Sequence, residues 1–422
     1  MTSVIEPRPF LTSLFWAAVN AADPAKTMPA FLPKPPKGRT IVIGAGKGAA
    51  QMAQAFERVW TGPIEGAVVT RYGFGAVCER IEVLESAHPV PDAAGLIASK
   101  KLLDLVSGLT AEDLVIALIC GGGSALLPAP AGALTLEDEI AVNKELLASG
   151  APISAMNAIR KHVSKIKGGR LAALAYPAKV VSLIVSDIPG DIASYVASGP
   201  TVPDANTRQD ALKLIGQYRM KFPEAVTRHL NSAEADAPLP SDKLFANNEV
   251  HIIASAAVSL EAAAAEARRQ GVEAVILSDA VEGEARESAK VHAAIAREVS
   301  VKDRPFRKPV VILSGGETTV TLTGKGKGGR NTEFLLSFAR AIEGCAGINA
   351  LAADTDGIDG SEDNAGAFAD GGSAGRMRGA GIDPAEYQRG NDAFTAFEAI
   401  SEIFHTGPTG TNVNDFRAIL VR

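Results

Sequence analysis

Cysteine is scarce in this chain of 422 residues, which contains only Cys78, Cys120 and Cys345. The three lie far apart and form no CxxC pair, which argues against a disulfide framework and against a thiolate metal site. The 6 histidines are dispersed as well. Cysteine usage of this kind is typical of a reducing compartment, so we expect a cytoplasmic protein.

Long hydrophobic runs are also absent. The apolar segment from Leu14 to Val19 is too short to cross a membrane and lacks the basic flank of a secretory signal. We therefore expect an amphipathic first helix over residues 10–22 and no transmembrane segment. The net charge of -6 at pH 7 gives no general attraction to nucleic acid or to an anionic membrane, so neither is an expected partner.

Several familiar catalytic motifs are missing. The chain has no GxxxxGK[ST] loop, no HRD or DFG sequence, no GxSxG elbow and no HExxH helix. These absences argue against a P-loop enzyme, a protein kinase, an α/β-hydrolase and a zinc protease of the HExxH type. Any phosphate chemistry must come from other glycine-rich segments.

The chain does contain short β-branched runs that alternate with longer helical patterns. Runs at 40–43, 67–70, 81–84, 114–120 and 180–185 predict strands, and the segments between them predict helices. This alternation is typical of an α/β fold with a parallel sheet covered by helices. Asp92 is expected to cap one helix, and Thr135 with Asp138 to form a capping box on another.

The length predicts two domains, because single hydrophobic cores stop growing at roughly 250 to 300 residues. Periodicity is lost between residues 232 and 247, where Ala, Asp, Glu and Pro dominate. We place the boundary there, giving a Rossmann-like domain at 1–240 and a smaller α/β domain at 241–422. Strands are expected in the second domain at 310–313 and 318–322, among others.

Most glycine clusters follow a predicted strand, at the edge where open α/β sheets bind ligands. The first cluster is GAGKGA, with Gly46 and Lys47, between a strand and a helix. It fits the dinucleotide pattern, but the next strand ends at Thr70 and Arg71 and offers no acidic residue for a ribose. Lys47 is either a phosphate-neutralising group or a solvated lysine, and its position at a helix start favours the former.

The second cluster is Gly121, Gly122, Gly123 and Ser124, directly after the strand at 114–120. Consecutive glycines let backbone N–H groups turn toward one point and form a nest for phosphate oxygens, although a tight turn alone would also explain them. The third cluster contains Asp187, which can serve as general base or magnesium ligand, or only as a turn former.

Two further clusters lie in the second half of the chain. Gly315, Gly316 and Glu317 follow a predicted strand, and the loop from Gly324 to Arg330 packs three cations among glycines. The loop is expected to be a mobile phosphate grip, or else a flexible hairpin, with Arg330 as the transition-state cation.

Asp354 opens the segment DTDGIDG, which lacks the ligand pattern of a calcium loop. We expect a magnesium or substrate role for it, with an Asx-rich structural turn as the alternative. His88, Arg160 and Asn412 are candidate substrate-binding residues. Most of the other basic residues at 160–170 are expected to form a solvated helix face.

Taken together, the segments GAGKGA, ESAHPVPD, CGGGSALL, NAIRKHVSKIKGGRLA, SDIPGD, ASGPTVPD, SGGETTV, GGRNTEF, DTDGIDG and GPTGTNVND resemble the glycerate 2-kinase family with a C-terminal MOFRL domain. The resemblance covers nearly the whole chain. It implies a Rossmann-like domain, a MOFRL region at about 310–420, and ATP with a divalent metal bound between two domains. It also implies that Lys47 and Arg330 are the catalytic cations.

The expected activity is therefore ATP- and Mg²⁺-dependent phosphorylation of D-glycerate at its 2-hydroxyl group, by a monomer or homodimer. Gly46, Gly121–Ser124 and Gly315–Glu317 are expected to hold ATP, with Asp187 as base and Asp187 or Asp354 as metal ligand. An NAD(P)H-dependent hydroxypyruvate reductase is the alternative enzyme. A sugar-acid-binding protein without turnover is the alternative from another class.

Overall fold

The computed structural model describes residues 5–422 and divides them into two compact units. One unit comprises Thr27–Ile253; the other comprises the residues up to Lys26 together with Ala254–Arg422. The first unit thus extends beyond the expected boundary at 240, because the strand that follows that boundary pairs with the first sheet. The N-terminal helix belongs to the second unit, since its apolar side completes that unit's core.

The first unit is built on a sheet with the strand order β3-β2-β1-β4-β5-β6. Its strands are β1 (Thr40–Ala45), β2 (Glu65–Arg71), β3 (Ile81–Ser86), β4 (Leu114–Cys120), β5 (Lys179–Val185) and β6 (Glu249–Ala254). The pairs β3-β2, β2-β1, β1-β4 and β4-β5 are parallel. This is the Rossmann order, with its topological switch point between β1 and β4, and it confirms the predicted parallel sheet.

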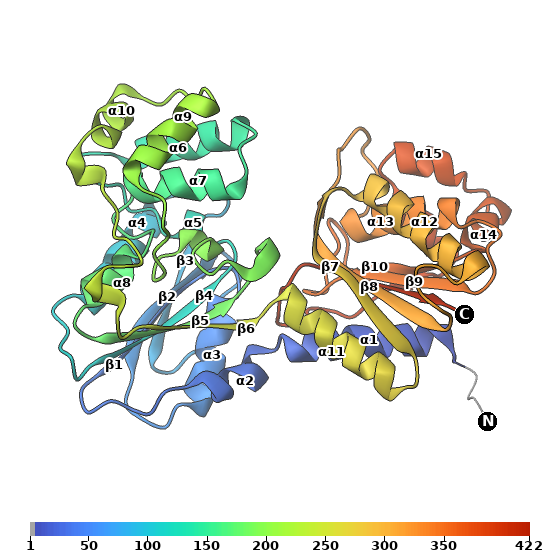
Figure 1. Ribbon diagram of the computed structural model, residues 1–422, viewed down its shortest axis with the longest axis horizontal. Helices are drawn as coiled ribbons and strands as arrows, with labels where there is room; N and C mark the ends of the chain where they lie inside the picture. Colours follow the sequence, from blue (N-terminus) through green and yellow to red (C-terminus); the bar gives the residue numbers. More distant parts are fainter. Residues whose placement is uncertain (1–4) are drawn as a thin grey trace. The chain divides into compact units, whose positions relative to one another are not determined.

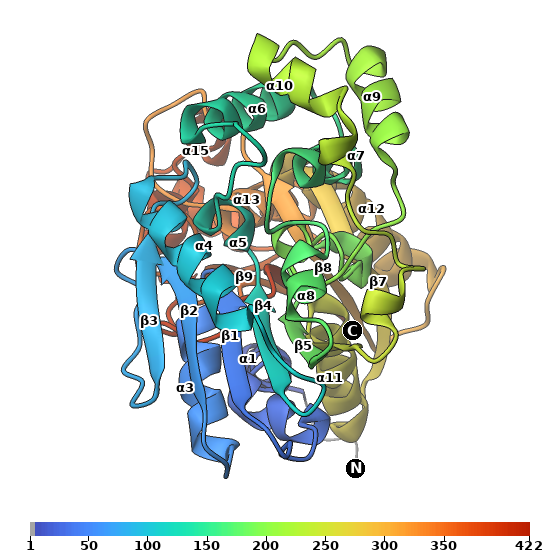
Figure 2. The ribbon, with the colours of Figure 1, turned by 90° about the vertical axis from the view of Figure 1, so that its left-hand side faces the viewer.

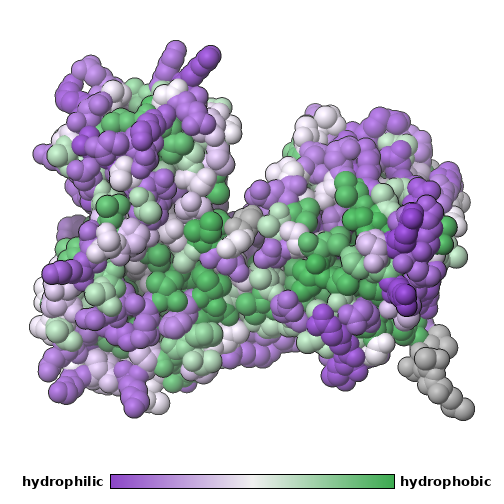
Figure 3. All heavy atoms as spheres, in the orientation of Figure 1, coloured by the Kyte–Doolittle hydropathy of each residue, from purple (hydrophilic) through white to green (hydrophobic). Residues whose placement is uncertain are grey.

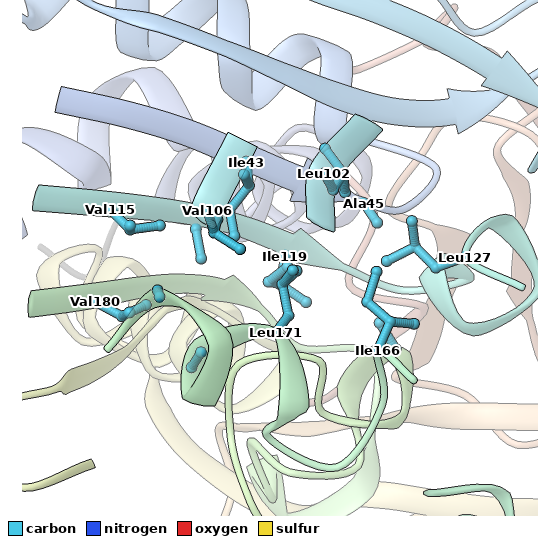
Figure 4. Packing of buried hydrophobic residues seen from close by; sticks show 14 of the residues in the cluster. Ile43, Ala45, Leu102, Val106, Val115, Ile119, Leu127, Ile166, Leu171 and Val180 are labelled. Atoms are coloured by element: carbon cyan, nitrogen blue, oxygen red, sulfur yellow. The ribbon is translucent and has the colours of Figure 1, made fainter. Parts of the chain in front are cut away.

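Helices cover both faces of this sheet. They are α3 (Ala49–Val59), α4 (Ala93–Val106), α5 (Gly123–Leu126) and α8 (Arg170–Ala175). Ile43, Ile119 and Leu171 belong to the buried cluster that joins the strands to α4 and α8 (Figure 4). The predicted caps are confirmed: Asp92 accepts a hydrogen bond from the Gly95 N–H, and Thr135 forms its capping box.

A second group of helices lies beyond the carboxyl ends of the strands (Figure 2). The group contains α6 (Leu136–Ala148), α7 (Ile153–Arg160), α9 (Arg208–Gln217) and α10 (Glu224–Leu230). Val142, Ile159 and Leu230 contribute to its own apolar core. Many hydrophilic side chains cover α9 and α10 on the face shown in Figure 3. This group of helices, the helical roof, therefore covers the sheet edge at which Rossmann-like domains bind ligands.

The second unit contains a mixed sheet with the order β11-β10-β9-β12-β8-β7. Its strands are β7 (Glu273–Glu284), β8 (Val310–Thr319), β9 (Ile348–Asp354), β10 (Gly366–Asp370), β11 (Ile403–Phe404) and β12 (Asp415–Val421). Only β7 and β8 pair in parallel among these described strands; the other four pairs are antiparallel.

Helices again cover both faces of the sheet (Figure 1). One face carries α1 (Pro7–Ala21) and α11 (Ala256–Arg269), and the other carries α12 (Ala285–Lys302) and α13 (Arg330–Ala341). Three short helices follow: α14 (Ser373–Gly379), α15 (Pro384–Arg389) and α16 (Ala393–Glu398). None of the helices in the described part of the chain is both long and apolar enough to cross a membrane.

The structure corrects one expectation about the second unit. Gly315 and Gly316 do not form a loop between two strands, because β8 runs through them without interruption. They pair with Phe416 and Asp415 of β12, and a β-carbon on Gly316 would collide with the backbone of Val281 in β7. These glycines permit close strand pairing at a point where the register of β7 shifts.

Candidate active site

The two glycine loops at the switch point of the first sheet interlock. The N–H group of Lys47 donates to the carbonyl oxygen of Gly121 at 2.9 Å, and the N–H group of Gly48 donates to Sγ of Cys120 at 3.2 Å. Gly46 has φ of +139°, and a β-carbon there would overlap Cys120. The close approach of the β1 and β4 loops therefore requires glycine at this position. The expected proximity of GAGKGA and CGGGS is confirmed.

Lys47 and His88 converge above Gly122. A β-carbon on Gly122 would lie 3.0 Å from Cγ of Lys47 and 3.2 Å from Nε2 of His88. Burial lowers the pKa of His88, and the nearby charges of Lys47 and Arg71 lower it further. His88 is therefore held neutral near pH 7, where its ring nitrogens can both donate and accept hydrogen bonds.

Asp187 lies over the neighbouring glycine. A β-carbon on Gly121 would lie 3.0 Å from Oδ1 of Asp187 and still closer to Oδ2, so glycine is what admits the carboxylate to this place. Burial raises the pKa of Cys120 to about 12, with the Asp187 charge acting in the same direction. Cys120 is thus a neutral thiol at physiological pH, and the acid–base capacity of this edge lies with Asp187, His88 and Lys47.

A chain of polar side chains connects the glycine nest to the helical roof. Oγ of Ser198 lies 2.9 Å from Oγ of Ser124 and 2.8 Å from Oδ1 of Asn157, which also accepts from Nη1 of Arg160 at 3.2 Å. Nε of Arg160 donates to Asn143 at 2.9 Å. The candidate residue Arg160 is therefore positioned by neutral amides, and no sequence spacing would have linked Ser198 to this chain.

The segment that carries Ser198 has an unusual backbone. Ala197 and Ser198 both have left-handed conformations, with φ of 53° and 60°, and Gly199 follows with φ of 57°. Non-glycine residues adopt this conformation only where the surrounding structure imposes it. Here Ala197 packs against Gly123, and a β-carbon added to Gly123 would lie 2.7 Å from the methyl group of Ala197.

The basic segment at 160–170 is not a solvated helix face, contrary to expectation. Lys161 and Lys167 are only 1% and 2% exposed. Lys161 forms an ion pair with Asp204, and Lys167 forms one with Glu139. Each ammonium group also donates to a backbone carbonyl oxygen at 3.0 Å. These lysines tie the helical roof to the rest of the unit, and their acidic partners lie too far along the sequence for the pattern to indicate them.

In the second unit, Arg330 opens α13 and is bound by three carboxylates. Nη1 donates to Glu317 at 2.9 Å, Nη2 donates to Asp354 at 2.6 Å, and Nε lies 2.6 Å from Asp415. Burial opposes the charge on Arg330, but the three carboxylates raise its pKa above the ordinary value. Arg330 is thus a permanent cation whose guanidinium group is held in one place.

The segment that begins at Asp354 is rich in Asx turns. Oδ1 of Asp354 accepts from the Asp356 N–H at 3.1 Å, and burial raises the pKa of Asp354 despite its ion pair with Arg330. Asp359 accepts from the first N–H groups of α13. The Asn412 amide lies 3.4 Å from Oδ2 of Asp356. These contacts are those of an Asx-rich structural turn.

The loop that precedes Arg330 is fixed by its neighbours. The N–H groups of Gly324 and Lys327 donate to Asn391 and Asp392 at 2.9 Å each. Nζ of Lys327 lies 3.3 Å from Glu362. This arrangement differs from the expected phosphate grip that is ordered only on binding, because residues 390–392 accept hydrogen bonds from its backbone and the Phe394 N–H group donates one to it.

Neither unit contains a preformed cluster of metal ligands. Within residues 5–422 no three side chains of His, Cys, Asp or Glu are grouped so that they could hold a metal ion. Mg²⁺ is commonly held by one or two carboxylates together with substrate phosphates, and such a site needs no cluster of this kind. The edge of the first sheet that carries the glycine loops after β1 and β4 is called the glycine edge. Asp187 lies at this edge, and its carboxylate is a ligand of the type that Mg²⁺ prefers.

Comparison with known proteins agrees with this architecture. Residues 10–231 match a family model described as a domain of unknown function (DUF4147), and residues 310–415 match the MOFRL family. A relative from Agrobacterium vitis, provisionally named hydroxypyruvate reductase, is 50% identical over 420 residues, which is 99% of this chain and 95% of the relative.

Other relatives carry kinase names. The D-glycerate 2-kinase of Thermotoga maritima is 39% identical over 400 residues, covering 94% of each chain. The glycerate kinase of Homo sapiens is 34% identical, covering 97% of this chain and 92% of the relative. The crystal structure of a glycerate kinase from Thermotoga maritima has a TM-score of 0.90 at 38% identity, covering 98% of this chain and 99% of that one. The chain therefore belongs to the glycerate 2-kinase family with a MOFRL domain.

Proposed function

We propose that the protein transfers the γ-phosphoryl group of ATP to the 2-hydroxyl group of D-glycerate. A bond forms between the hydroxyl oxygen and the γ-phosphorus, the bond to the bridging oxygen of ADP breaks, and the hydroxyl proton passes to a base. The observation that carries this proposal is the glycine edge of the first sheet. Lys47 and Asp187 lie there over the adjacent residues Gly122 and Gly121.

The backbone of residues 121–124 is suited to phosphate oxygens. Gly122 has φ of +81° and precedes the first turn of α5, so successive N–H groups can face one anion. Lys47 lies over Gly122 at the same place, and its ammonium group is proposed to neutralise the migrating phosphoryl group. In this proposal Gly46 permits the close approach of the two loops.

Asp187 is proposed as the base that accepts the hydroxyl proton, or as a ligand of Mg²⁺. His88 and Arg160 are proposed to contact the substrate from the β3 side and from α7. When bound, Mg²⁺ would neutralise charge on the phosphates. Both oxygens of Asp354 accept hydrogen bonds within the second unit, so a metal role for Asp354 would require these contacts to be exchanged.

Several expected roles in the second unit stay predictions. Arg330 is proposed as a second catalytic cation on the motif resemblance, and its three carboxylate partners hold its guanidinium group in place. Glu317 would act indirectly, by holding Arg330. The nucleotide role expected of Gly315 and Gly316, and the substrate role expected of Asn412, have no support beyond the motif resemblance.

The alternative enzyme is an NAD(P)H-dependent hydroxypyruvate reductase. The name of the relative from Agrobacterium vitis and the Rossmann strand order favour it. Against it, β2 ends in Arg71 and not in an acidic residue that could bind a ribose hydroxyl group. The kinase is therefore the better-supported activity.

The test is to incubate the purified full chain with D-glycerate, ATP and Mg²⁺ and to identify the product by phosphorus NMR. Formation of 2-phosphoglycerate supports the proposal. NADPH oxidation with hydroxypyruvate, without any phosphoglycerate, would replace it by the reductase. Lys47→Ala should lower turnover by about 10² or more. The control Lys37→Ala removes an exposed lysine before the other end of β1 and should leave turnover unchanged.

A further inference from the structure

Arg71 is a basic residue at the glycine edge that the roles proposed above do not use. It is the last residue of β2 and pairs with Ser86 at the end of β3. Its guanidinium carbon lies 3.5 Å from the centroid of the Phe74 ring. Its Nε is buried and has no hydrogen-bond partner in the described part of the chain. Arg71 is therefore held in place by stacking, with its Nε donor unused.

Two carboxylates that contact the residues directly after Arg71 have other partners. Glu85 accepts from the N–H groups of Gly73 and Gly75 at 3.2 and 3.1 Å. Asp92 accepts from the Tyr72 hydroxyl group at 2.7 Å and caps α4. Neither of these contacts involves Arg71, so its planar donor group is open to an acceptor from solvent or from a ligand.

Arg71 shares its surroundings with His88 and Lys47. The positive charges of Lys47 and Arg71 both act on the His88 ring, and Lys47 and His88 lie together above Gly122. Three basic side chains, Lys47 after β1, Arg71 at the end of β2 and His88 after β3, thus approach one place. An arrangement of this kind attracts an anion, and a guanidinium group next to an imidazole suits a planar carboxylate.

The opposite flank of the same edge carries the carboxylate of Asp187, over Gly121. Gly121 and Gly122 are adjacent, and consecutive Cα atoms are about 3.8 Å apart. A small 2-hydroxy acid with its carboxylate at Arg71 and His88 would therefore present its hydroxyl group near Lys47 and Asp187. Nucleotide phosphates would lie at the nest after β4, at the switch point, and not at the end of β2.

We propose that Arg71, together with His88, binds the carboxylate of the hydroxy-acid substrate and so determines the preference for an acid over a neutral polyol. This inference rests on the proposed function. It adds to that function the orientation of the substrate: carboxylate toward β2 and β3, reacting hydroxyl toward β4 and β5.

Binding without turnover is the first test. D-glycerate is titrated into the full chain by calorimetry, without ATP, for wild type, Arg71→Met, Arg71→Lys and Arg58→Met. Arg71→Met should weaken binding roughly 10- to 100-fold, the value of hydrogen bonds to a charged group, and Arg71→Lys should weaken it less. The control Arg58→Met removes an exposed arginine in the last turn of α3, away from the glycine edge, and should have no effect.

Steady-state kinetics give the second test. Arg71→Met should raise the KM for D-glycerate by a similar factor, leave the KM for ATP unchanged, and reduce the preference for D-glycerate over glycerol. An effect on the KM for ATP instead, or on NADPH binding, would overturn the proposal and assign Arg71 to a nucleotide. Proton NMR of His88 checks the geometry, because its pKa should rise in Arg71→Met and stay constant in Arg58→Met.

The two proposals fail in different ways. If wild type binds D-glycerate through Arg71 but forms no phosphoglycerate, the kinase proposal fails and the carboxylate site stands. If wild type forms 2-phosphoglycerate while Arg71→Met binds D-glycerate as wild type does, the carboxylate site fails and the kinase stands. A melting temperature for Arg71→Met close to that of wild type shows that its lost binding is not lost folding.

Discussion

Replacing Gly121 by alanine would push a methyl group into the carboxylate of Asp187. Gly121 does not have a left-handed backbone conformation, so alanine brings no backbone strain there. The added β-carbon would lie 1.8 Å from Oδ2 of Asp187, whereas ordinary contact begins near 3.4 Å. The carboxylate, or the loop that carries it, must therefore move by about 1.6 Å.

A displacement of this size is large for a reacting group. Misplacement by about 1 Å can lower turnover by about 10²-fold, and overpacking of this kind costs about 1–3 kcal/mol of stability. We expect Gly121→Ala to lower kcat for D-glycerate phosphorylation about 10²-fold while the protein remains folded. Initial rates at saturating substrates and urea denaturation measure the two effects separately.

The same substitution elsewhere in the unit provides the control. Gly216 lies within α9, and a β-carbon on it would meet no atom within 4 Å. Gly216→Ala should therefore keep the wild-type kcat and stabilise the protein by about 0.5–1 kcal/mol, since alanine favours helix. If Gly121→Ala also retained the wild-type kcat, Asp187 would not be a reacting group and its proposed role as base would be refuted.

Three further predictions concern buried charged groups. Burial lowers the pKa of His162 to about 4 from an ordinary value of 6.5. As the pH falls, His162 is therefore protonated in the unfolded chain at a higher pH than in the folded chain, and the folded state loses stability. The free energy of unfolding should drop by about 3 kcal/mol between pH 7 and pH 4 in urea titrations, and His162→Gln should remove this contribution. Lys161→Met leaves Asp204 buried without its cation and should lower the free energy of unfolding by about 3–5 kcal/mol. Lys161→Met combined with Asp204→Leu should recover most of this loss. Equal losses in the single and double variants would contradict this account. Arg330→Lys should keep the melting temperature near that of wild type but lower kcat by at least about 10²-fold. Arg330→Met should lower both the melting temperature and kcat, because it leaves Asp354 without its ion pair. A wild-type kcat in Arg330→Lys would restrict Arg330 to a structural role.

The strands and helices of the first unit were predictable because their signals are local. The strand at Leu114–Cys120 is an uninterrupted apolar run, and its observed limits are those expected. The capping box at Thr135 depends on residues three positions apart. By contrast, β10 and β11 were not predicted, because β10 is rich in alanine and glycine and β11 has only 2 residues. Such strands depend on their neighbours in the sheet more than on their own composition.

Partnerships between distant residues were the part of the site that could not be predicted. Lys161 and Lys167 have the spacing of solvated residues, yet each is buried against an acid 43 or 28 positions away in the sequence. The carboxylates around Arg330 come from three separate strands or strand ends, and only the fold brings them together. A basic residue in a motif can therefore be recognised from sequence, but whether it is free for a ligand depends on partners that the motif does not contain.

The contrast between two glycine clusters shows where sequence patterns are ambiguous. Gly121 and Gly122 follow the end of β4 and form the turn into α5, whereas Gly315 and Gly316 lie inside β8. Both clusters follow an apolar run, so the glycines alone do not distinguish a ligand nest from a close strand pairing. The residues that follow do: Ser124 leads into alanine and leucine, which favour helix, while Gly316 is followed by Glu317 and then by threonines and valine, which favour strand. A glycine cluster predicts an anion site in this fold only when helix-forming residues come next, because only then do free N–H groups remain to bind the anion.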